Sequence, residues 1–241
     1  MPPMTPGKLI TFEGGEGAGK STQIARLAER LRARGIDPVT TREPGGSPGA
    51  EAIRALLVQG DPGRWTPMTE ALLHYAARLD HLERTIRPAL GQGRWVISDR
   101  FADSTVAYQG YGHRLGREAI ASLHRLLLGD FAPDLTVIFD IPVEVGLGRA
   151  AARAGESSCE GTPDGVTRAS KDAPLSGRYG DSHENRYERM DGGFHERMRQ
   201  GFLEIARAEP ARCVVVDANR DADSVAADVW RAVETRLLGK G

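Results

Sequence analysis

The chain has 241 residues, of which 40% are hydrophobic and 27% charged, so it can build a full hydrophobic core in one or two domains. Its 32 basic and 33 acidic residues give a formal net charge of -1, which argues against binding of nucleic acid through a general basic field. Of the basic residues, 28 are Arg and 4 are Lys. Arg suits bidentate contacts with phosphate, but a coding bias would give the same excess.

Cysteines and apolar runs give no sign of secretion or membrane insertion. Cys159 and Cys213 are far apart and fit no metal-ligand spacing, so neither a disulfide framework nor a zinc site is predicted. No stretch of about 18 apolar residues occurs, and the first residues lack a basic segment followed by a long apolar one. We therefore expect a cytoplasmic protein without a membrane partner.

Short β-branched runs alternate with longer segments of helical period, which is typical of a parallel sheet with helices on both faces. The first predicted helix has apolar residues at 24, 27, 28 and 31 and ends near Gly35. A later helix begins with Thr66 as N-cap and Pro67, and runs toward Pro88. The last spans about 221–238. The predicted strands are 9–13, 39–41, 95–98, 135–140 and 213–217.

One segment, 155–185, breaks this alternation. It is rich in Gly, Ser, Asp and Pro, has few apolar residues and shows no periodicity. A structureless insertion of this length is usually a lid, a binding loop or a disordered segment. We expect a single domain over residues 1–241 with a mobile lid at about 150–186.

A glycine-rich motif follows the first predicted strand and opens the first predicted helix. Residues 14–21, GGEGAGKS, fit G-x-x-x-x-G-K-[ST], the phosphate-binding P-loop. Its backbone N–H groups can point at a β-phosphate, while Lys20 reaches the β- and γ-phosphates and Ser21 binds Mg²⁺. The predicted nucleotide-binding residues are Gly14, Gly15, Glu16, Gly17, Ala18, Gly19, Lys20, Ser21 and Thr22.

Two acidic residues bear on this motif, Asp99 from a later strand and Glu16 from within the motif itself. Asp99 ends a buried-looking strand, where ligands gather in open parallel sheets, so we predict that it joins Ser21 at the metal and that Arg100 faces a phosphate. A strand-end ion pair between Asp99 and Arg100 is the plainer alternative. Glu16 would repel phosphates unless it faced away, either toward a hydroxyl of a second substrate or toward solvent.

Five motifs occur along the chain: FEGGEGAGKST at 12–22, TREPGG at 41–46, YAAR at 75–78, SDRF at 98–101 and AYQG at 107–110. In this order and spacing they resemble bacterial thymidylate kinases, which are P-loop nucleoside monophosphate kinases, over nearly the whole chain except 155–185. The resemblance implies an α/β P-loop NTPase fold, a three-layer sandwich with a five-stranded parallel sheet flanked by helices and a mobile lid. It also implies a homodimer that phosphorylates dTMP to dTDP with ATP and Mg²⁺ for dTTP synthesis.

The resemblance further implies how the substrates are bound. Arg54 and Arg100 would hold the dTMP phosphate, and Arg78 would donate to a thymine carbonyl. Glu16 would lie near the sugar hydroxyl, and the segment 217–220 would lie against adenine. The full predicted dTMP site is Glu16, Arg54, His74, Arg78, Arg100, Thr105, Tyr108 and Gln109.

The sequence departs from the family pattern at two positions. His74 stands where a Phe usually stacks on thymine; a neutral imidazole can stack, whereas a plain surface histidine is the alternative. Gly17 stands where animal and yeast relatives have an Arg, so we expect an arginine beside the insertion, Arg149, Arg153 or Arg186, to close over the phosphates. A solvated basic helix face is the alternative for 149–153. The predicted catalytic residues are Lys20, Arg149, Arg153, Glu16 and Arg100.

Other P-loop proteins are the competing interpretations. In a deoxynucleoside kinase, or another kinase of a small acceptor, a carboxylate acts as base on a hydroxyl; Arg54 with Arg100 favours an acceptor that carries phosphate. A GTPase is disfavoured because the Asn-Lys-x-Asp motif is missing. A nucleotide-binding protein without turnover is a third class. The helix face with Leu72, Leu79 and Leu82 fits a dimer interface and the core equally well.

Overall fold

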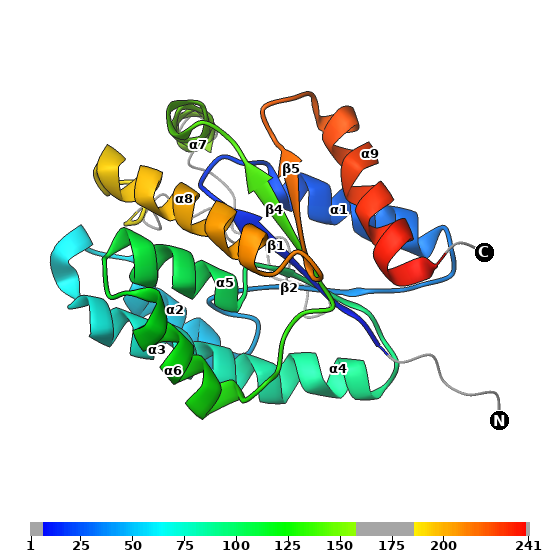
Figure 1. Ribbon diagram of the computed structural model, residues 1–241, viewed down its shortest axis with the longest axis horizontal. Coiled ribbons are helices and arrows are strands. Elements are labelled where there is room, and N and C mark those ends of the chain that lie inside the picture. The colour runs from blue at the N-terminus through cyan, green and yellow to red at the C-terminus, as the bar shows by residue number, and fades with distance from the viewer. Residues whose placement is uncertain (1–6, 158–185, 240–241) are drawn as a thin grey trace, which may run out of the picture.

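The computed structural model of the protein describes residues 7–157 and 186–239. Its centre is a five-stranded parallel sheet with the order β2-β3-β1-β4-β5 (Figure 1). In the register, Ile10 of β1 lies opposite Ile97 of β3 and Leu135 of β4. The predicted strands agree with the observed ones to within one residue at each end. The strands are β1 Leu9–Gly14, β2 Val39–Arg42, β3 Val96–Asp99, β4 Leu135–Asp140 and β5 Cys213–Asp217.

Helices cover both faces of this sheet, which confirms the predicted α/β three-layer architecture (Figure 1). Helices α1 and α9 pack on one face, and α3, α4, α6 and α8 pack on the other. The helices are α1 Lys20–Arg32, α2 Pro48–Val58, α3 Pro67–His81, α4 Arg87–Gly91, α5 Ala102–Thr105, α6 Arg117–Leu128, α7 Val143–Ser157, α8 Gly192–Ala208 and α9 Ala222–Val233, with a 3₁₀ turn at Pro62–Arg64 and π-helical segments at Leu82–Ile86, Val106–Gly112 and Glu234–Leu238.

Alternation along the central strand sends its side chains to both layers. Ile10 and Phe12 join the cluster under α1 and α9, whereas Leu9 joins the cluster under α3 and α6. On that second face, β1 also carries the fully buried Thr11 and Glu13. The polar positions occur near the carboxyl end of the strand, where a parallel sheet places its ligand site.

The predicted starts of the helices agree with the structure, whereas the predicted end of the helix that begins at Thr66 does not. Thr66 is the N-cap of α3, and its hydroxyl accepts a hydrogen bond from the backbone N–H of Thr69 (3.4 Å). The helix does not stop cleanly before Pro88, because α3 continues through the π-helical segment into α4. Leu82 is fully buried there, while Leu72 on α3 is 48% exposed. Core packing therefore accounts for Leu82, which leaves Leu72 as the exposed member of the predicted interface.

The P-loop turn packs directly against the first turn of α7. Gly17 has φ of 67°, and a Cβ on it would lie 1.9 Å from the backbone oxygen of Gly146. A Cβ on Gly146 would in turn lie 2.5 Å from the backbone oxygen of Glu16. This close approach fixes the position of α7 relative to the P-loop. Most of the predicted lid, residues 158–185, lies outside the described residues.

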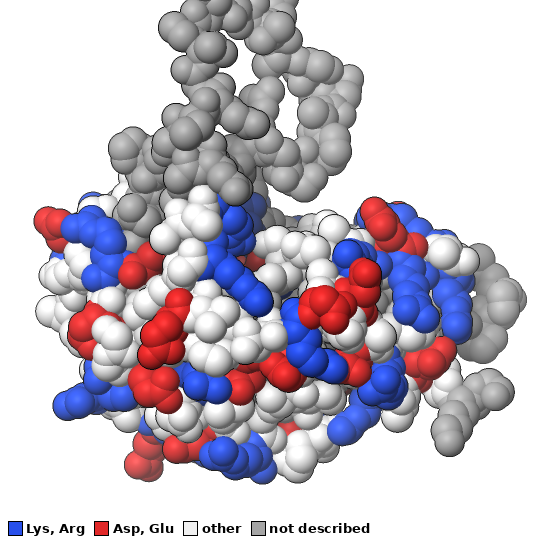
Figure 2. Space-filling view, turned by 90° about the horizontal axis from the view of Figure 1, so that it is seen from above, with Lys and Arg blue, Asp and Glu red and all other residues white. Residues whose placement is uncertain are grey.

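Surface charges are interspersed over the face in Figure 2, where basic and acidic side chains alternate. Several arginines there and elsewhere pair with acidic neighbours, as in the contacts of Arg26 with Asp223 and of Arg199 with Asp140. Ion pairing is therefore one use of the arginine excess. Among the described helices, none is both long and apolar enough to cross a membrane.

We predict that Gly146→Ala destabilises the protein, because its methyl group would press on the P-loop backbone. Such overpacking costs about 1–3 kcal/mol. Gly148→Ala is the matched control on the same helix, since a Cβ there meets no atom within 4 Å. The control should gain up to about 1 kcal/mol from helix propensity. Chemical unfolding of both variants measures the difference, and equal stability of the two would contradict the close approach.

Candidate active site

The phosphate cradle connects the carboxyl end of β1 to the start of α1. Gly14, Gly17 and Gly19 have φ of 130°, 67° and 83°, which side-chain-bearing residues rarely adopt. Gly14 also has no room for a Cβ, which would lie 2.5 Å from the backbone oxygen of Phe139. These glycines therefore let the loop turn tightly at the N-terminus of α1, where the helix dipole favours an anion.

Lys20 is buried at the centre of the cradle. Its Nζ donates to the backbone oxygens of Gly15 (2.9 Å) and Gly14 (3.2 Å). Burial lowers the Lys20 pKa to about 8, and the nearby Arg100 guanidinium lowers it in the same direction. A phosphate in the cradle would oppose both effects, because a negative charge favours the protonated ammonium.

Ser21 and Asp99 form an oxygen-rich pair at the edge of the cradle. The Ser21 hydroxyl lies 3.4 Å from Asp99 Oδ2, and Asp99 Oδ1 is buried without a hydrogen-bond partner among the described residues. Hydroxyl and carboxylate oxygens suit Mg²⁺, which takes only one or two protein ligands and completes its shell with phosphate and water. The described residues contain no cluster of three or more His, Cys, Asp or Glu side chains that could hold a metal alone. The pair therefore fits a magnesium ion bound together with a nucleotide.

The turn after β3 holds Arg100 in an uncommon backbone conformation. Arg100 has φ of 71°, and its carbonyl oxygen accepts a hydrogen bond from the Ser98 hydroxyl (2.7 Å). Glu13 fixes the other side of the turn, because its carboxyl group accepts from Phe101 N–H (2.7 Å) and from the Ser104 hydroxyl (2.5 Å). Several independent contacts thus hold a strained conformation, a pattern that favours a functional role for the side chain.

The Arg100 side chain reaches back over the cradle to Glu16. Its Nη2 donates to Glu16 Oε1 (2.9 Å), which also accepts from the Tyr108 hydroxyl (2.7 Å). Burial alone would raise the Glu16 pKa, but the charges of Arg100 and Lys20 lower it to about 2. Glu16 is therefore an ionised carboxylate, and its Oε1 is held by Arg100 and Tyr108 at the boundary between the cradle and a neighbouring pocket.

A second pocket adjoins the cradle. Seven of the eight residues predicted for the dTMP site line it: Glu16, Arg54, His74, Arg100, Thr105, Tyr108 and Gln109. The eighth, Arg78, is buried behind the wall and donates from Nη2 to Thr105 Oγ1 (3.0 Å). Residues from five separate parts of the chain thus converge on one cavity.

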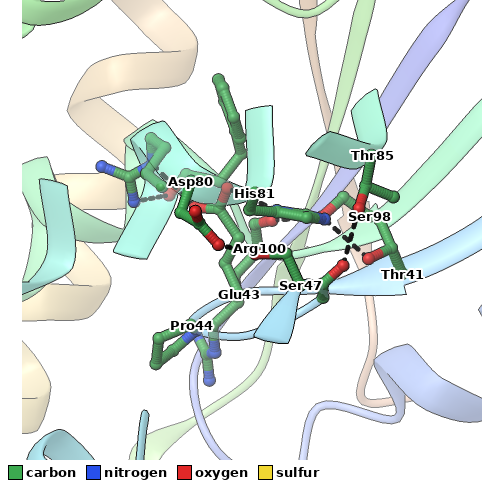
Figure 3. Close-up of polar contacts among 12 residues, drawn as sticks. Thr41, Glu43, Pro44, Ser47, Asp80, His81, Thr85, Ser98 and Arg100 are labelled. Carbon is green, nitrogen blue, oxygen red and sulfur yellow. Dashed lines mark hydrogen bonds and ion pairs between the residues drawn. The ribbon is translucent and has the colours of Figure 1, made fainter. Parts of the chain in front are cut away.

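The cradle and this pocket meet along a shared wall. Glu16, Glu43, Arg54 and Arg100 line both cavities. Figure 3 shows Arg100 close to Glu43 and Pro44, where the loop after β2 reaches the carboxyl end of β3. Two anions bound in the two cavities would therefore meet at arginine side chains.

The three arginines beside the insertion have different surroundings. Arg153 is exposed on α7 and lines the cleft over the cradle together with Lys20 and Ser21. Arg149 donates to the backbone oxygen of Ala218 (3.1 Å), in the segment predicted to contact adenine. Arg186 is fully buried and pairs with Glu70 (2.5 Å), so it does not face the phosphates. Arg149 and Arg153 on α7 therefore remain the candidates for the arginine that is predicted to close over the phosphates.

Several known proteins are similar to this chain in sequence and in structure. A family model described as thymidylate kinase matches residues 12–173. A thymidylate kinase from Caulobacter vibrioides is 53% identical, covering 97% of this chain and 99% of its own length. One from Dinoroseobacter shibae is 52% identical, covering 93% of this chain and 95% of its own length. The crystal structure of thymidylate kinase from Ehrlichia chaffeensis matches with a TM-score of 0.66 and 31% identity, covering 95% of this chain and 99% of that one.

The chain belongs to the thymidylate kinase family. Membership confirms the predicted P-loop NTPase fold and the predicted kinase activity on dTMP, and it does not favour a deoxynucleoside kinase. The residue roles carried over from the thymidylate kinase pattern stay predictions.

One wall of this second pocket was not predicted from the sequence. Tyr187 and Glu188 line it, and they directly follow the buried Arg186. Arg186 is anchored by Glu70 and by the backbone oxygens of residues 57, 61 and 62, so it holds the two neighbours in place. Their only sequence signal is a tyrosine and an acid beside a lone arginine, which does not reveal a partner more than 100 residues away.

His74, the departure from the family pattern, lies in the pocket and not on the surface. Its Nε2 forms a hydrogen bond with the Tyr187 hydroxyl (2.8 Å). Burial lowers the His74 pKa from 6.5 to about 4, although the Glu70 carboxylate opposes the shift. The imidazole is therefore neutral near pH 7. Tyr75, its neighbour in sequence, packs in the core as the helical period predicts.

We predict that the contribution of His74 to dTMP affinity does not change between about pH 8 and about pH 5.5, because the ring stays neutral above its lowered pKa. The measurement is the ratio of the KM for dTMP of His74→Phe to that of the unchanged protein over this range. The ratio removes the titration of the dTMP phosphate, which affects both proteins alike. A change in the ratio centred near pH 6.5 would contradict the neutral ring.

Proposed function

We propose that the protein transfers the γ-phosphoryl group of ATP to the phosphate of dTMP, with the cradle holding ATP and the adjoining pocket holding dTMP. The observation that carries this assignment of sites is the shared wall, where Arg54 and Arg100 line both cavities. A nucleoside acceptor would need a base for its hydroxyl and no such pair of cations. An acceptor phosphate is already an anion and needs charge neutralisation instead.

The proposed reaction joins an oxygen of the dTMP phosphate to the γ-phosphorus, and the bond from that phosphorus to the β–γ bridging oxygen breaks. ADP leaves with the electron pair of that bond. Lys20 would hold the β- and γ-phosphates, and Arg54 with Arg100 would reduce the repulsion between donor and acceptor. Glu16, fixed by Arg100 and Tyr108, would accept a hydrogen bond from the sugar hydroxyl.

Magnesium is proposed at Ser21 and Asp99, whose oxygens suit it. When bound, the ion would neutralise charge on the β- and γ-oxygens of the nucleotide. We also propose that residues 1–241 act as one kinase domain, cytoplasmic and homodimeric, without a nucleic acid or membrane partner. Its product dTDP would then serve dTTP synthesis.

The acceptor assignment is tested by ADP release from Mg²⁺-ATP in the presence of dTMP, dUMP, dCMP, dGMP or thymidine at equal concentration. Turnover should be fastest with dTMP and should be small with thymidine, because thymidine brings no phosphate to Arg54 and Arg100. Faster turnover with thymidine, or ADP release that ignores the acceptor, would overturn the proposal.

We propose Arg153 as the arginine that contacts the transferring phosphoryl group, because it lines the cleft over Lys20. Arg153→Ala should lower kcat by about 100-fold or more. Arg149→Ala is the matched comparison on the same helix. It should mainly raise the KM for ATP, since Arg149 supports the segment 217–220. A larger loss of kcat in Arg149→Ala than in Arg153→Ala would reverse the assignment.

A further inference from the structure

Two of the three nitrogens of the Arg78 guanidinium form hydrogen bonds within the protein. Arg78 is 2% exposed, and its Nε donates to Glu43 Oε2 (2.7 Å). Its Nη2 donates to Phe101 O and to Thr105 Oγ1, both at 3.0 Å. Nη1 is buried and has no partner in the described part of the chain. A buried donor without an acceptor is unfavourable, so Nη1 is the group left for a ligand oxygen.

The direction of Nη1 depends on Glu43. The guanidinium is planar, so the bond from Nε to Glu43 fixes the plane in which Nη1 points. Glu43 also lines the acceptor pocket, and it is 5% exposed. Burial raises its pKa, but Arg78 and the hydrogen bond from His81 outweigh burial and keep the pKa below its ordinary value. Glu43 is therefore a charged group that must itself be held in place.

His81 holds it. His81 Nδ1 lies 3.0 Å from Glu43 Oε1, and because a carboxylate only accepts, Nδ1 carries the proton. The other ring nitrogen, Nε2, pairs with the Thr41 hydroxyl (2.7 Å). Figure 3 shows the ring lying between Thr41 on β2 and Glu43 in the loop that follows. His81 is fully buried and belongs to α3, the helix that also carries Arg78.

The loop that carries Glu43 is packed tightly onto this ring. A Cβ on Gly46 would lie 2.4 Å from His81 Nε2, and Gly46 has φ of 85°. The backbone oxygen of Gly46 accepts from the Thr85 hydroxyl (2.8 Å), and the Ser47 hydroxyl donates to Asp80 (2.6 Å). Figure 3 shows these contacts around His81. Contacts on both sides thus fix the position of the ring. Through its hydrogen bond to Glu43, the fixed ring also constrains the position of the Glu43 carboxylate.

We infer that His81 is a positioning residue for base recognition: through Thr41 on one side and Glu43 on the other, it sets the direction of Arg78. The inference rests on the proposed function and on the role that the family resemblance implies for Arg78, donation to a thymine carbonyl. His81 touches neither substrate. Its loss should therefore weaken selection of the base and leave ATP binding and the phosphoryl-transfer step nearly unchanged.

Two isosteric variants separate positioning from simple packing. Asn places its amide nitrogen near the position of Nδ1, so His81→Asn keeps a donor for Glu43 and loses Thr41. Gln places its amide near Nε2, so His81→Gln keeps Thr41 and loses Glu43. Arg84 lies in the adjoining π-helical segment and forms an exposed ion pair with Asp80. Arg84→Ala is the control for a substitution in this region that leaves His81 in place.

His81→Gln should raise the KM for dTMP about ten-fold, because one hydrogen bond to a buried carboxylate is lost, and should change kcat and the KM for ATP little. The preference for dTMP over dCMP should fall by a similar factor, because cytosine carries an amino group where thymine has a carbonyl. His81→Asn should stay within about three-fold of the unchanged protein on both measures. Arg84→Ala should match the unchanged protein.

Calorimetric titration with dTMP alone gives a second readout that needs no turnover. Equal losses in His81→Asn and His81→Gln, or an unchanged preference for dTMP over dCMP in His81→Gln, would overturn the inference and leave the proposed function intact. Failure of the unchanged protein to phosphorylate dTMP would instead overturn the proposed function, and the inference with it.

Discussion

Three glutamate–arginine pairs, two of them buried and one half-buried, organise the side of the molecule where we propose that dTMP binds. Glu16 pairs with Arg100 (2.9 Å), Glu43 with Arg78 (2.7 Å) and Glu70 with Arg186 (2.5 Å). Desolvating such a pair costs about as much as the attraction returns, so burial of ions is a weak source of stability. Each pair instead fixes the orientation of its arginine side chain, because a planar guanidinium that is hydrogen-bonded to a carboxylate can rotate little. The pairs therefore place the pocket walls as well as the charges.

The carboxylates of these pairs have lowered pKa values, whereas the pKa of the nearby buried Glu13 is raised. Burial raises the pKa of both Glu16 and Glu70. The charges of Arg100 and Lys20 outweigh burial at Glu16, and the hydrogen bond from His113 with nearby charges outweighs it at Glu70, so each pKa falls to about 2. Because the folded pKa lies below the unfolded value of 4.5, both groups contribute stability above that pH and lose it as pH falls toward 2. For Glu13, burial and then the charge of Asp103 raise the pKa to about 8. Glu13 therefore destabilises the fold increasingly as pH rises from 4.5 to about 8, because over that range the unfolded state loses a proton that the folded state keeps.

The sequence predicted the parts of the site that depend on backbone and missed those that depend on distant partners. Glycines at 14, 17 and 19 are required by their own conformation, so the cradle could be recognised locally. Strand alternation and helical period likewise predicted the sheet. The partner of Arg186 could not be predicted, since position beside the insertion suggested the phosphates and the structure pairs it with Glu70. Nothing local shows that Tyr187 reaches His74 across more than 100 residues.

Charge is distributed unevenly along the acceptor pocket, and this distribution can orient the nucleotide. At one end, Arg54 and Arg100 face the cradle. At the other, His74 is neutral near pH 7 and is hydrogen-bonded to Tyr187, while Arg186 balances the charge of Glu70 behind them. A nucleotide with an uncharged base and a dianionic phosphate therefore has one favourable direction in the pocket. That direction brings its phosphate to the shared wall, beside Lys20, where we propose that transfer takes place. Replacing the family Phe by a neutral His–Tyr pair keeps this polarity, which a charged histidine would reduce.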